Sequence, residues 1–342
     1  MKKVAILGAN GYSGEELCLI LARHPHVQIT AVTSRQHAGK GITEVLPRLT
    51  GAAGLAGLRF SEPNVDSITA SGAEYAFLAL PHGLASEFAV PLLQAGLKVI
   101  DLSADFRLRD PAIFQEFYGE SHAAPALLAE AVYGIPEIHR EEIAKARLVA
   151  SAGCYPTSIL LPLIPLLKDG LIKPASIVVS SASGVSGAGR KAETPLLFAE
   201  CNESLRAYSV PKHRHLSEIE QELSFAAGNK VLITFVPHLA PMTRGIHSTI
   251  FTAPEDGIAL KEIEASWKKA YANEPFVRLI ESLPDVKSVA HTNFCDIAAR
   301  LDTRTGRLLL FSAEDNLVKG AAGQAVQNFN LMAGLPETES LL

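Results

Sequence analysis

The amino-terminal stretch constrains the fold more than any other part of this sequence. An apolar run, Val4 to Leu7, leads into the glycine-rich turn Gly8-Ala-Asn-Gly-Tyr-Ser-Gly14, and an apolar helical pattern follows from Glu15 to Arg23. Glycines in such a turn let the backbone approach a pyrophosphate that rests on the helix N-terminus. The pattern predicts a nucleotide-binding α/β domain; the alternative is a tight turn that only joins strand to helix. The predicted cofactor contacts in this turn are Gly8, Asn10, Gly11, Tyr12, Ser13 and Gly14.

The end of the second predicted strand indicates which nucleotide is bound. An NAD site places an acidic residue there, about twenty residues past the last glycine, against the ribose 2′-hydroxyl. After the strand Gln28 to Thr33, this chain instead continues Ser-Arg-Gln-His-Ala-Gly-Lys40. A hydroxyl at Ser34 and a cation at Arg35, with Lys40 nearby, suit a 2′-phosphate, so we expect NADP(H). The alternative for Arg35 is a solvated loop arginine.

Two further buried strands continue the alternation of strand and helix. Glu74 to Leu80 ends in Pro81-His-Gly83, and Leu97 to Leu102 is followed by Ser103-Ala-Asp-Phe-Arg107. Ligands of open α/β sheets bind at the carboxyl ends of the strands. We therefore expect the cofactor at this edge and a doubly wound, Rossmann-like domain over residues 1–150. The residues predicted to lie at the edge are Leu80, Pro81, His82 and Arg107, although a structural role for His82 is equally compatible.

Beyond residue 150 the alternation gives way to a succession of strands. Few predicted helices interrupt them, which indicates an α+β domain with a mixed or largely antiparallel sheet over residues 151–315. A closing helix from Asn316 to Ala333 is expected to pack back on the first domain, which residues 316–342 complete. The predicted strands are Ala175–Ala182, Lys230–Pro237, His247–Thr252, Asn293–Leu301 and Arg307–Phe311, and the helices between them are Leu216–Ala226 and Leu260–Tyr271.

Cys154 lies where a strand gives way to a helix. The strand pattern covers Arg147 to Ser151, the apolar helical stretch covers Thr157 to Lys168, and Gly153 permits the turn between them. Unpaired N–H groups and a partial positive charge at a helix N-terminus favour a thiolate over a thiol. Cys154 is therefore a candidate nucleophile; the alternative is an inert cysteine that packs the turn.

Two sequence details refine the expected helix after Cys154. Pro156 suits the first helical position, and the hydroxyls of Thr157 and Ser158 are candidate caps. Pro162 and Pro165 fall inside the pattern and are expected to kink or shorten the helix.

Composition bounds the remaining possibilities. With 342 residues, 48% hydrophobic and 20% charged, the chain is long enough for two compact domains. A net charge of −5 without any Lys/Arg-rich run argues against a nucleic-acid partner, and no apolar run reaches the length of a membrane span. The amino-terminus enters a strand directly, so a cytoplasmic location is expected. The four cysteines are far apart and lack metal-site spacing, so we expect free thiols and no metal; Cys18 and Cys295 are expected to be packing residues.

Three polar stretches in the second half supply further candidates. Ser183-Gly-Val-Ser-Gly-Ala-Gly-Arg-Lys191 follows a strand and is expected to form a nest of backbone N–H groups for an anion or a carbonyl oxygen. Lys212-His-Arg-His215 precedes a helix that carries Glu218, and a histidine near a cysteine is the usual partner for proton transfer. Near His238, which serves either chemistry or turn packing, Arg244 is a candidate clamp for a substrate carboxylate. A hydride carrier, a thiolate, a proton-transferring histidine and anion-binding cations are the parts that phosphorylating aldehyde dehydrogenation needs.

At the level of whole motifs the sequence resembles the N-acetyl-gamma-glutamyl-phosphate reductases, of the longer size type, within the semialdehyde dehydrogenase superfamily. The matching segments span nearly the whole chain. They are Gly8-Ala-Asn-Gly-Tyr-Ser-Gly14, Leu80-Pro-His-Gly83, Asp101-Leu-Ser-Ala-Asp-Phe-Arg107, Tyr133-Gly-Ile-Pro-Glu137, Ala152-Gly-Cys-Tyr-Pro-Thr157, Ser183-Gly-Val-Ser-Gly-Ala-Gly-Arg190, Lys212-His-Arg-His215 and Pro237-His-Leu-Ala-Pro-Met-Thr-Arg-Gly245.

The resemblance implies a fold, a reaction and roles for the candidates. It implies a Rossmann-like NADP-binding domain joined to a glyceraldehyde-phosphate-dehydrogenase-like substrate and dimerisation domain, in a homodimer or homotetramer. The implied reaction is the NADPH-dependent, reversible reduction of N-acetyl-L-glutamyl 5-phosphate to N-acetyl-L-glutamate 5-semialdehyde and phosphate, in arginine biosynthesis, through a thioester and a thiohemiacetal on Cys154. The implied acid/base is His215 or His213, with Glu218 orienting the imidazole. The other implied contacts are Ser183, Gly184 and Asn316 to the cofactor, and Arg107, Ser186, Gly187, Arg190, Lys212 and Arg244 to the substrate; for Arg107 a cofactor contact is the alternative.

Three alternatives stay open at this point. The same chemistry on an aminoadipyl phosphate, a carrier-protein-linked phosphate or aspartyl phosphate would use the same residues. A regulator that binds NADP without turnover would keep the fold and lose the reaction. A thiol hydrolase would keep Cys154 and bind no nicotinamide nucleotide.

Overall fold

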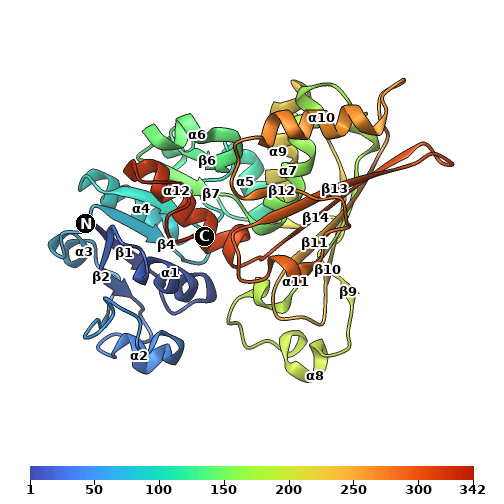
Figure 1. The fold of residues 1–342 in the computed structure, drawn as a ribbon. Helices are drawn as coiled ribbons and strands as arrows, with labels where there is room; N and C mark the ends of the chain where they lie inside the picture. The colour runs from blue at the N-terminus through green and yellow to red at the C-terminus, as the bar shows by residue number, and fades with distance from the viewer. The chain divides into compact units, whose positions relative to one another are not determined.

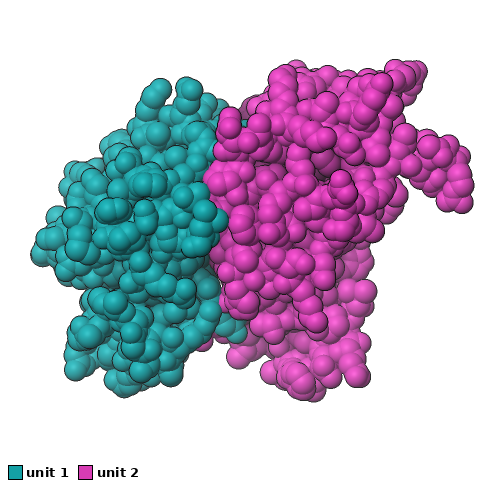
Figure 2. Space-filling view, in the orientation of Figure 1, with its two compact units in different colours: residues 1–152, 321–342 teal, residues 153–320 magenta.

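The computed structural model describes all residues, 1–342. The chain forms two compact units: residues 1–152 with 321–342, and residues 153–320 (Figure 1, Figure 2). The chain passes from the first unit to the second after Ala152 and returns after Gly320. Both points are close in sequence to candidate residues, Cys154 and Asn316. Each unit has its own seven-stranded sheet.

The sheet of the first unit is parallel throughout. Its strand order reverses between β1 and β4, the topological switch point at which doubly wound sheets bind their ligands. Strands buried on both faces explain why the sequence shows continuous apolar runs here rather than alternation. In spatial order the strands are β3 (Phe60–Ser61), β2 (Val27–Thr33), β1 (Lys2–Leu7), β4 (Tyr75–Leu78), β5 (Lys98–Asp101), β7 (Leu148–Ser151) and β6 (Val132–Gly134).

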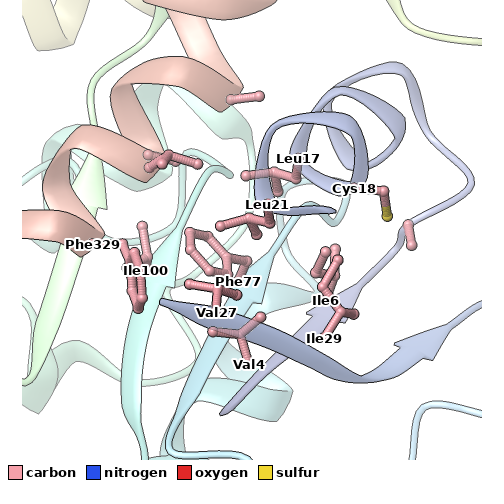
Figure 3. Packing of buried hydrophobic residues seen from close by; sticks show 14 of the residues in the cluster. Val4, Ile6, Leu17, Cys18, Leu21, Val27, Ile29, Phe77, Ile100 and Phe329 are labelled. Carbon is pink, nitrogen blue, oxygen red and sulfur yellow. The ribbon is translucent and has the colours of Figure 1, made fainter. Parts of the chain in front are cut away.

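Helices cover both faces of this sheet. One apolar core lies beneath α1 and α12 and another beneath α3 and α4. Figure 3 shows the first core, where Leu17 and Leu21 of α1 and Phe329 of α12 meet strand residues such as Val4 and Phe77. The helices of this unit are α1 (Tyr12–Ala22), α2 (Ile42–Val45), α3 (Val65–Ala70), α4 (Ala85–Gln94), α5 (Pro111–Tyr118), α6 (Pro136–Lys145) and α12 (Gly323–Ala333).

The carboxyl-terminal helix α12 is joined to this unit by buried amides as well as by apolar packing. Asn328 donates a hydrogen bond from Nδ2 to the Gly134 carbonyl (3.1 Å), and the Oδ1 atom of Asn330 lies 3.0 Å from Nε2 of His24. The sequence pattern predicts one helix from Asn316 to Ala333, whereas the structure has a π-helical turn, Val318–Ala322, before α12 begins.

The second unit carries a mixed sheet, which confirms the expected α+β character. Antiparallel pairs join β13, β14, β11 and β8, while β12–β13 and β8–β10 are parallel. In spatial order the strands are β12 (Val277–Leu279), β13 (Cys295–Asp302), β14 (Arg307–Glu314), β11 (Ile246–Thr252), β8 (Val178–Ser183), β10 (Thr234–Leu239) and β9 (Arg206–Ala207). The helices are α7 (Cys154–Lys168), α8 (Phe198–Cys201), α9 (Arg214–Ala227), α10 (Leu260–Tyr271) and α11 (Val286–Val289).

One face of this sheet is covered by α7 and the other is partly open. Alternate residues of β8, β11 and β14 are buried, and those between them are exposed or half-buried. Val178 and Phe251 face each other across β8 and β11 on the open face and are 39% and 38% exposed. None of the helices combines the length and the apolar character that a membrane crossing requires.

The structure corrects three expectations about α7. The helix begins at Cys154, so Pro156 occupies the third helical position, and it runs to Lys168 with Pro162 and Pro165 inside it. The hydroxyls of Thr157 and Ser158 bind carbonyl oxygens of Gly153 and Tyr155 instead of capping the first turn. The helix tolerates two prolines because it is buried between the sheet and neighbouring helices, and tertiary packing outweighs local propensity.

Candidate active site

Cys154 is the first residue of α7, immediately after the turn that follows β7. The capping residue Gly153 has no side chain and the helix carries no side-chain cap. The N–H groups of the first turn are those that a helix leaves unpaired, and the partial positive charge of the helix N-terminus favours a thiolate beside it. The other cysteines, Cys18, Cys201 and Cys295, are free and buried, and burial raises the pKa of Cys18 to about 12. The predicted strand-to-helix position of Cys154 is confirmed.

Glu218 fixes the turn before Cys154. It lies on α9, it is buried, and its Oε1 atom accepts a hydrogen bond from the Gly153 N–H at 2.8 Å. Since α9 packs along α7, the carboxylate reaches the backbone next to the candidate nucleophile. The observed role is therefore support of the Cys154 turn, whereas the orientation of an imidazole by Glu218 stays a prediction.

The two candidate histidines occupy different positions on α9. His213 is the capping residue, and its Nδ1 atom accepts a hydrogen bond from the His215 N–H at 3.1 Å. Burial, and after it the charge of Arg214, lowers the pKa of His213 to about 4. The ring of His213 packs against Phe235 and two tyrosines, whereas His215 lies in the first turn of the helix. His213 is thus a neutral capping group, which leaves His215 as the candidate for proton transfer.

Two tyrosines line the same region, and the sequence reasoning gave neither of them a role. Tyr155 follows Cys154, and its ring lies edge-on to His213 (5.5 Å between centroids) and to His215 (6.0 Å). The hydroxyl of Tyr208 donates a hydrogen bond to that of Tyr155 at 3.0 Å. Burial raises the pKa of Tyr155 and raises that of Tyr208 to about 12, so both phenols are neutral donors. Only the position of Tyr155 next to Cys154 signalled this arrangement in the sequence.

The loop after β8 is not an anion nest. The N–H groups of Gly184, Val185 and Ser186 donate to carbonyls of the segment 242–245, and those of Gly187 and Gly189 donate within the loop. The expectation of a nest is therefore wrong for these five N–H groups, because each of them is already used inside the protein. A Cβ atom at Gly184 would lie 2.7 Å from the backbone of Thr243 and Arg244, so this close approach requires glycine.

Asn316 forms hydrogen bonds with both the loop after β8 and the segment 242–245. Its Oδ1 atom accepts a hydrogen bond from the Gly245 N–H at 2.7 Å, and its Nδ2 donates to the Ser186 hydroxyl at 3.0 Å. The hydroxyl of Ser183 donates to the Gly184 carbonyl at 3.1 Å. Contacts of these residues with cofactor or substrate stay predictions.

The predicted substrate cations divide into exposed and buried ones. Arg190 and Lys212 are exposed. Arg244 is largely buried and pairs with the fully buried Asp315 at 3.3 Å. His238 is half-buried, and its carbonyl accepts a weak hydrogen bond from Tyr155 at 3.5 Å.

In the first unit the glycine-rich turn has the close approaches that its glycines predict. Gly8 has φ +76°, and a Cβ atom at Gly14 would lie 2.5 Å from the Gly8 carbonyl oxygen. Gly11 caps α1 without a side-chain hydrogen bond, so the first-turn N–H groups face no capping side chain. At the end of β2, the Thr33 hydroxyl is buried and has no hydrogen-bond partner. Asn10, Tyr12 and Ser13 are half-buried, Ser34 is buried, and Arg35 and Lys40 are exposed.

The edge residues of β4 and β5 differ in exposure. Pro81 and His82 are exposed, Leu80 is half-buried, and the His82 ring lies 5.7 Å from that of Tyr118. Arg107 is buried and donates hydrogen bonds to the carbonyls of Ser151 (2.8 Å) and Leu102 (2.9 Å). Arg107 therefore anchors the end of β7, three residues before Cys154.

Comparisons with known proteins agree along the whole chain. Residues 3–146 match the family model "Semialdehyde dehydrogenase, NAD binding domain" and residues 154–316 match "Semialdehyde dehydrogenase, dimerisation domain". The N-acetyl-gamma-glutamyl-phosphate reductase of Akkermansia muciniphila is 56% identical over 99% of this chain and 98% of its own length. That of Moorella thermoacetica is 50% identical over 100% and 98%.

Solved structures show the same fold at much lower identity. Aspartate semialdehyde dehydrogenase II from Vibrio cholerae, complexed with ASA, has a TM-score of 0.73 at 18% identity, covering 98% of both chains. The aspartate semialdehyde dehydrogenase with NADP from Candida albicans has a TM-score of 0.71 at 14% identity, covering 97% of this chain and 98% of its own. With near full-length relatives at half identity or more, the chain belongs to the N-acetyl-gamma-glutamyl-phosphate reductase family of semialdehyde dehydrogenases.

Proposed function

We propose that this chain catalyses the reversible, NADPH-dependent reduction of N-acetyl-L-glutamyl 5-phosphate to N-acetyl-L-glutamate 5-semialdehyde and phosphate, a step of arginine biosynthesis in the cytoplasm. One observation carries the proposal: relatives with this activity in their name match the chain over nearly its whole length at about half identity or more. The position of Cys154 at the start of a buried helix supports it independently.

The first unit fits a nicotinamide nucleotide. The uncapped N-terminus of α1 and the close turn from Gly8 to Gly14 suit a pyrophosphate. The partnerless hydroxyl of Thr33 lies where β2 ends and suits a ribose. The absence of a carboxylate at that point, with Arg35 exposed, favours the 2′-phosphate of NADP. We assign the other predicted contacts of this unit to the same cofactor: Asn10, Tyr12, Ser13, Ser34, Leu80, Pro81 and His82.

In the proposed reaction Cys154 acts as nucleophile. Its thiolate attacks the carbonyl carbon of the acyl phosphate, phosphate leaves with the electron pair of the C–O bond, and a thioester remains on sulfur. NADPH, when bound, supplies the hydride that reduces this thioester. His215 protonates the resulting oxyanion and takes the proton back as the thiohemiacetal releases the aldehyde and the thiolate.

The surrounding residues hold this arrangement. We assign Glu218 and Arg107 to positioning, because they bind the backbone at Gly153 and Ser151 on either side of the turn before Cys154. We assign the exposed cations Arg190 and Lys212 to the substrate phosphate or α-carboxylate. Arg244 supports the site through Asp315.

The proposal is tested by mixing the protein with N-acetyl-glutamate semialdehyde, NADP and phosphate, and following NADPH absorbance. Phosphate-dependent NADPH formation is expected. If no nicotinamide nucleotide gives a signal, the assignment is wrong. Competition with aspartate semialdehyde and an N-acetyl-aminoadipate semialdehyde then identifies the chain length that the site prefers.

The positions of the two histidines give a prediction about pH. Because folding holds His213 neutral with a pKa of about 4, against 6.5 for an unburied histidine, the unfolded chain binds more protons between these values. The contribution of His213 to the free energy of unfolding is therefore fully present above pH 6.5 and is lost as the pH drops toward 4. Replacing His213 with Asn keeps a capping side chain. In thermal unfolding, the variant is expected to lose less stability than the wild type between pH 6.5 and 4. Its activity at pH 7.5 should be nearly unchanged.

The matched variant His215→Asn is expected to behave in the opposite way. It removes the proton-transferring ring, so kcat should fall by about 10²-fold. Steady-state kinetics and unfolding curves on the two variants measure both effects. A larger fall in kcat for His213→Asn than for His215→Asn contradicts the assignment.

Specificity for NADP gives a further prediction. Replacing the exposed Arg35 with Ala removes a cation from the proposed 2′-phosphate contact, so KM for NADPH is expected to rise by about tenfold while KM for NADH changes less than twofold. The exposed Arg304, in the turn between β13 and β14 of the second unit, provides the control Arg304→Ala. Equal changes in both KM values contradict a 2′-phosphate contact.

The open sheet face supports a homodimer, or a homotetramer built from such dimers. Val178 and Phe251 expose apolar surface side by side on the unit that matches the dimerisation model. Replacing Phe251 with Asp is expected to yield monomers in sedimentation velocity at micromolar concentration. Leu232, which lies between α9 and β10 and is more exposed than Phe251, gives the control Leu232→Asp. An unchanged sedimentation coefficient for Phe251→Asp excludes this face as the interface.

A further inference from the structure

A buried carboxylate lies beside the candidate nucleophile. Gly320 has no side chain, and a Cβ atom built on it would lie 2.7 Å from Cβ of Cys154 and 2.9 Å from Oε1 of Glu314. The nucleophile and the carboxylate therefore border the same small space. Glu314 is fully buried, and nothing in the sequence analysis or in the proposed mechanism gives it a role.

The backbone fixes this neighbourhood firmly. Glu314 is the last residue of β14 and pairs with Ile246 on one side and Cys295 on the other. The following segment turns through the π-helix Val318–Ala322, in which the Gly320 N–H donates to the Asp315 carbonyl at 2.9 Å. π-Helical turns frequently occur at functional sites, and this one brings a glycine against Cys154.

The charges around Cys154 are of mixed sign. The helix N-terminus contributes partial positive charge, and Glu218 contributes a carboxylate that is bound to the Gly153 N–H. Lys319 is fully buried in the same π-helical turn, 5.7 Å from the Phe276 ring. Tyr155 and Tyr208 are further ionisable groups near Cys154, and the His215 ring lies edge-on to Tyr155. Glu314 is the carboxyl group whose side-chain oxygen borders the same Gly320 position as the Cys154 side chain.

We propose that Glu314 is a positioning residue that destabilises the Cys154 thiolate relative to the acyl-enzyme. This inference rests on the proposed function. When the thiolate attacks the acyl phosphate, a C–S bond forms, the C–O bond to phosphate breaks, phosphate leaves with the electron pair, and the sulfur changes from an anion to a neutral thioester. Repulsion between the carboxylate and the sulfur is present before this step and is relieved by it. In a water-poor surrounding such repulsion is strong, so Glu314 promotes acylation at a cost in thiolate population.

The test is the replacement of Glu314 with the isosteric Gln. Alkylation of Cys154 by iodoacetamide, followed by mass spectrometry of the peptide that contains it, gives the pH midpoint of thiolate formation without any substrate. We expect the midpoint to fall by about one pH unit, so that alkylation below the midpoint is about threefold faster, because about tenfold more thiolate outweighs its lower nucleophilicity. At a pH above both midpoints, where both proteins hold Cys154 as thiolate, the burst of phosphate release from the acyl phosphate is expected to be about threefold slower in the variant, because a thiolate of lower pKa is a weaker nucleophile. A purely structural role for Glu314 would not move the midpoint downward while slowing acylation of the fully formed thiolate.

Asp296→Asn is the matched control. Asp296 is a buried carboxylate next to Cys295 on β13, and its side chain lies on the opposite face of the sheet, paired with Arg278. In Asp296→Asn, the pH midpoint of Cys154 alkylation should equal that of the wild type. If Glu314→Gln does not fold, Glu314→Asp, which withdraws the charge by one methylene, should lower the midpoint by a smaller amount. An unchanged or raised midpoint in the folded variant overturns the inference.

These readouts also separate this inference from the proposed function. Failure of the wild-type protein to reduce the acyl phosphate refutes the proposed reaction. The alkylation midpoint still reports whether the Glu314 carboxylate acts on Cys154.

Discussion

Replacing Cys154 with Ser is expected to lower kcat by at least roughly 10⁴-fold, the largest effect on activity that we predict. Serine differs by one atom and fits the first position of α7, so the fold and the KM for NADPH should be retained. A hydroxyl beside a helix N-terminus stays protonated at neutral pH, because its pKa is far above that of a thiol. The substitution therefore removes the nucleophile and little else.

A second measurement shows whether the loss is one of covalent chemistry. Incubated with the acyl phosphate in the absence of NADPH, the wild-type protein should gain the mass of one acyl group, and the Cys154→Ser variant should gain none. Cys201 offers the control: it is buried on α8, and its Sγ atom contacts the Pro195 carbonyl at 3.3 Å, an interaction that serine can keep. Cys201→Ser should retain nearly full activity. More than about 1% residual kcat in Cys154→Ser contradicts thioester chemistry.

The largest expected effect on stability comes from replacing Phe329 with Ala. Phe329 is fully buried in the first core, with its ring centroid 5.0 Å from that of Tyr75 and 5.6 Å from that of Phe77 (Figure 3). Truncation removes the apolar contact, leaves a cavity and abolishes the edge-on pair with Tyr75 and the tilted pair with Phe77, which together cost about 3–5 kcal/mol. Urea unfolding followed by circular dichroism measures this difference.

The surface residue Phe198 provides the comparison. It is 82% exposed on α8, so Phe198→Ala is expected to change the free energy of unfolding by less than about 0.5 kcal/mol. If Phe329→Ala costs less than about 1 kcal/mol, α12 does not contribute to the core as the structure describes.

The features that were predictable from the sequence are those with local causes. A strand, a glycine turn and an apolar helix within a short stretch gave the position of α1, and the same local pattern placed Cys154 at the start of α7. The predicted helix Leu260–Tyr271 matches α10 residue for residue, because its amphipathic spacing is regular. The general α/β and α+β organisation followed from the order of these patterns.

The features that were not predictable depend on partners distant in sequence. The loop from Ser183 to Lys191 has the composition of an anion nest, but its N–H groups are used by carbonyls about sixty residues further on. The two prolines of α7 are tolerated because of packing that the helix sequence does not contain. Glu314 lies in an ordinary strand pattern, and only the π-helical turn after it brings Cys154 and the carboxylate together.

The placement of α12 has a consequence for how the protein is made. The first unit begins with the first residues of the chain, yet its core includes Phe329 and its buried amide contacts include Asn328 and Asn330. During synthesis the amino-terminal strands are produced long before α12, so the part of their apolar face that α12 covers stays exposed until this helix emerges. Premature termination near the carboxyl end would therefore leave the amino-terminal sheet exposed to aggregation and proteolysis.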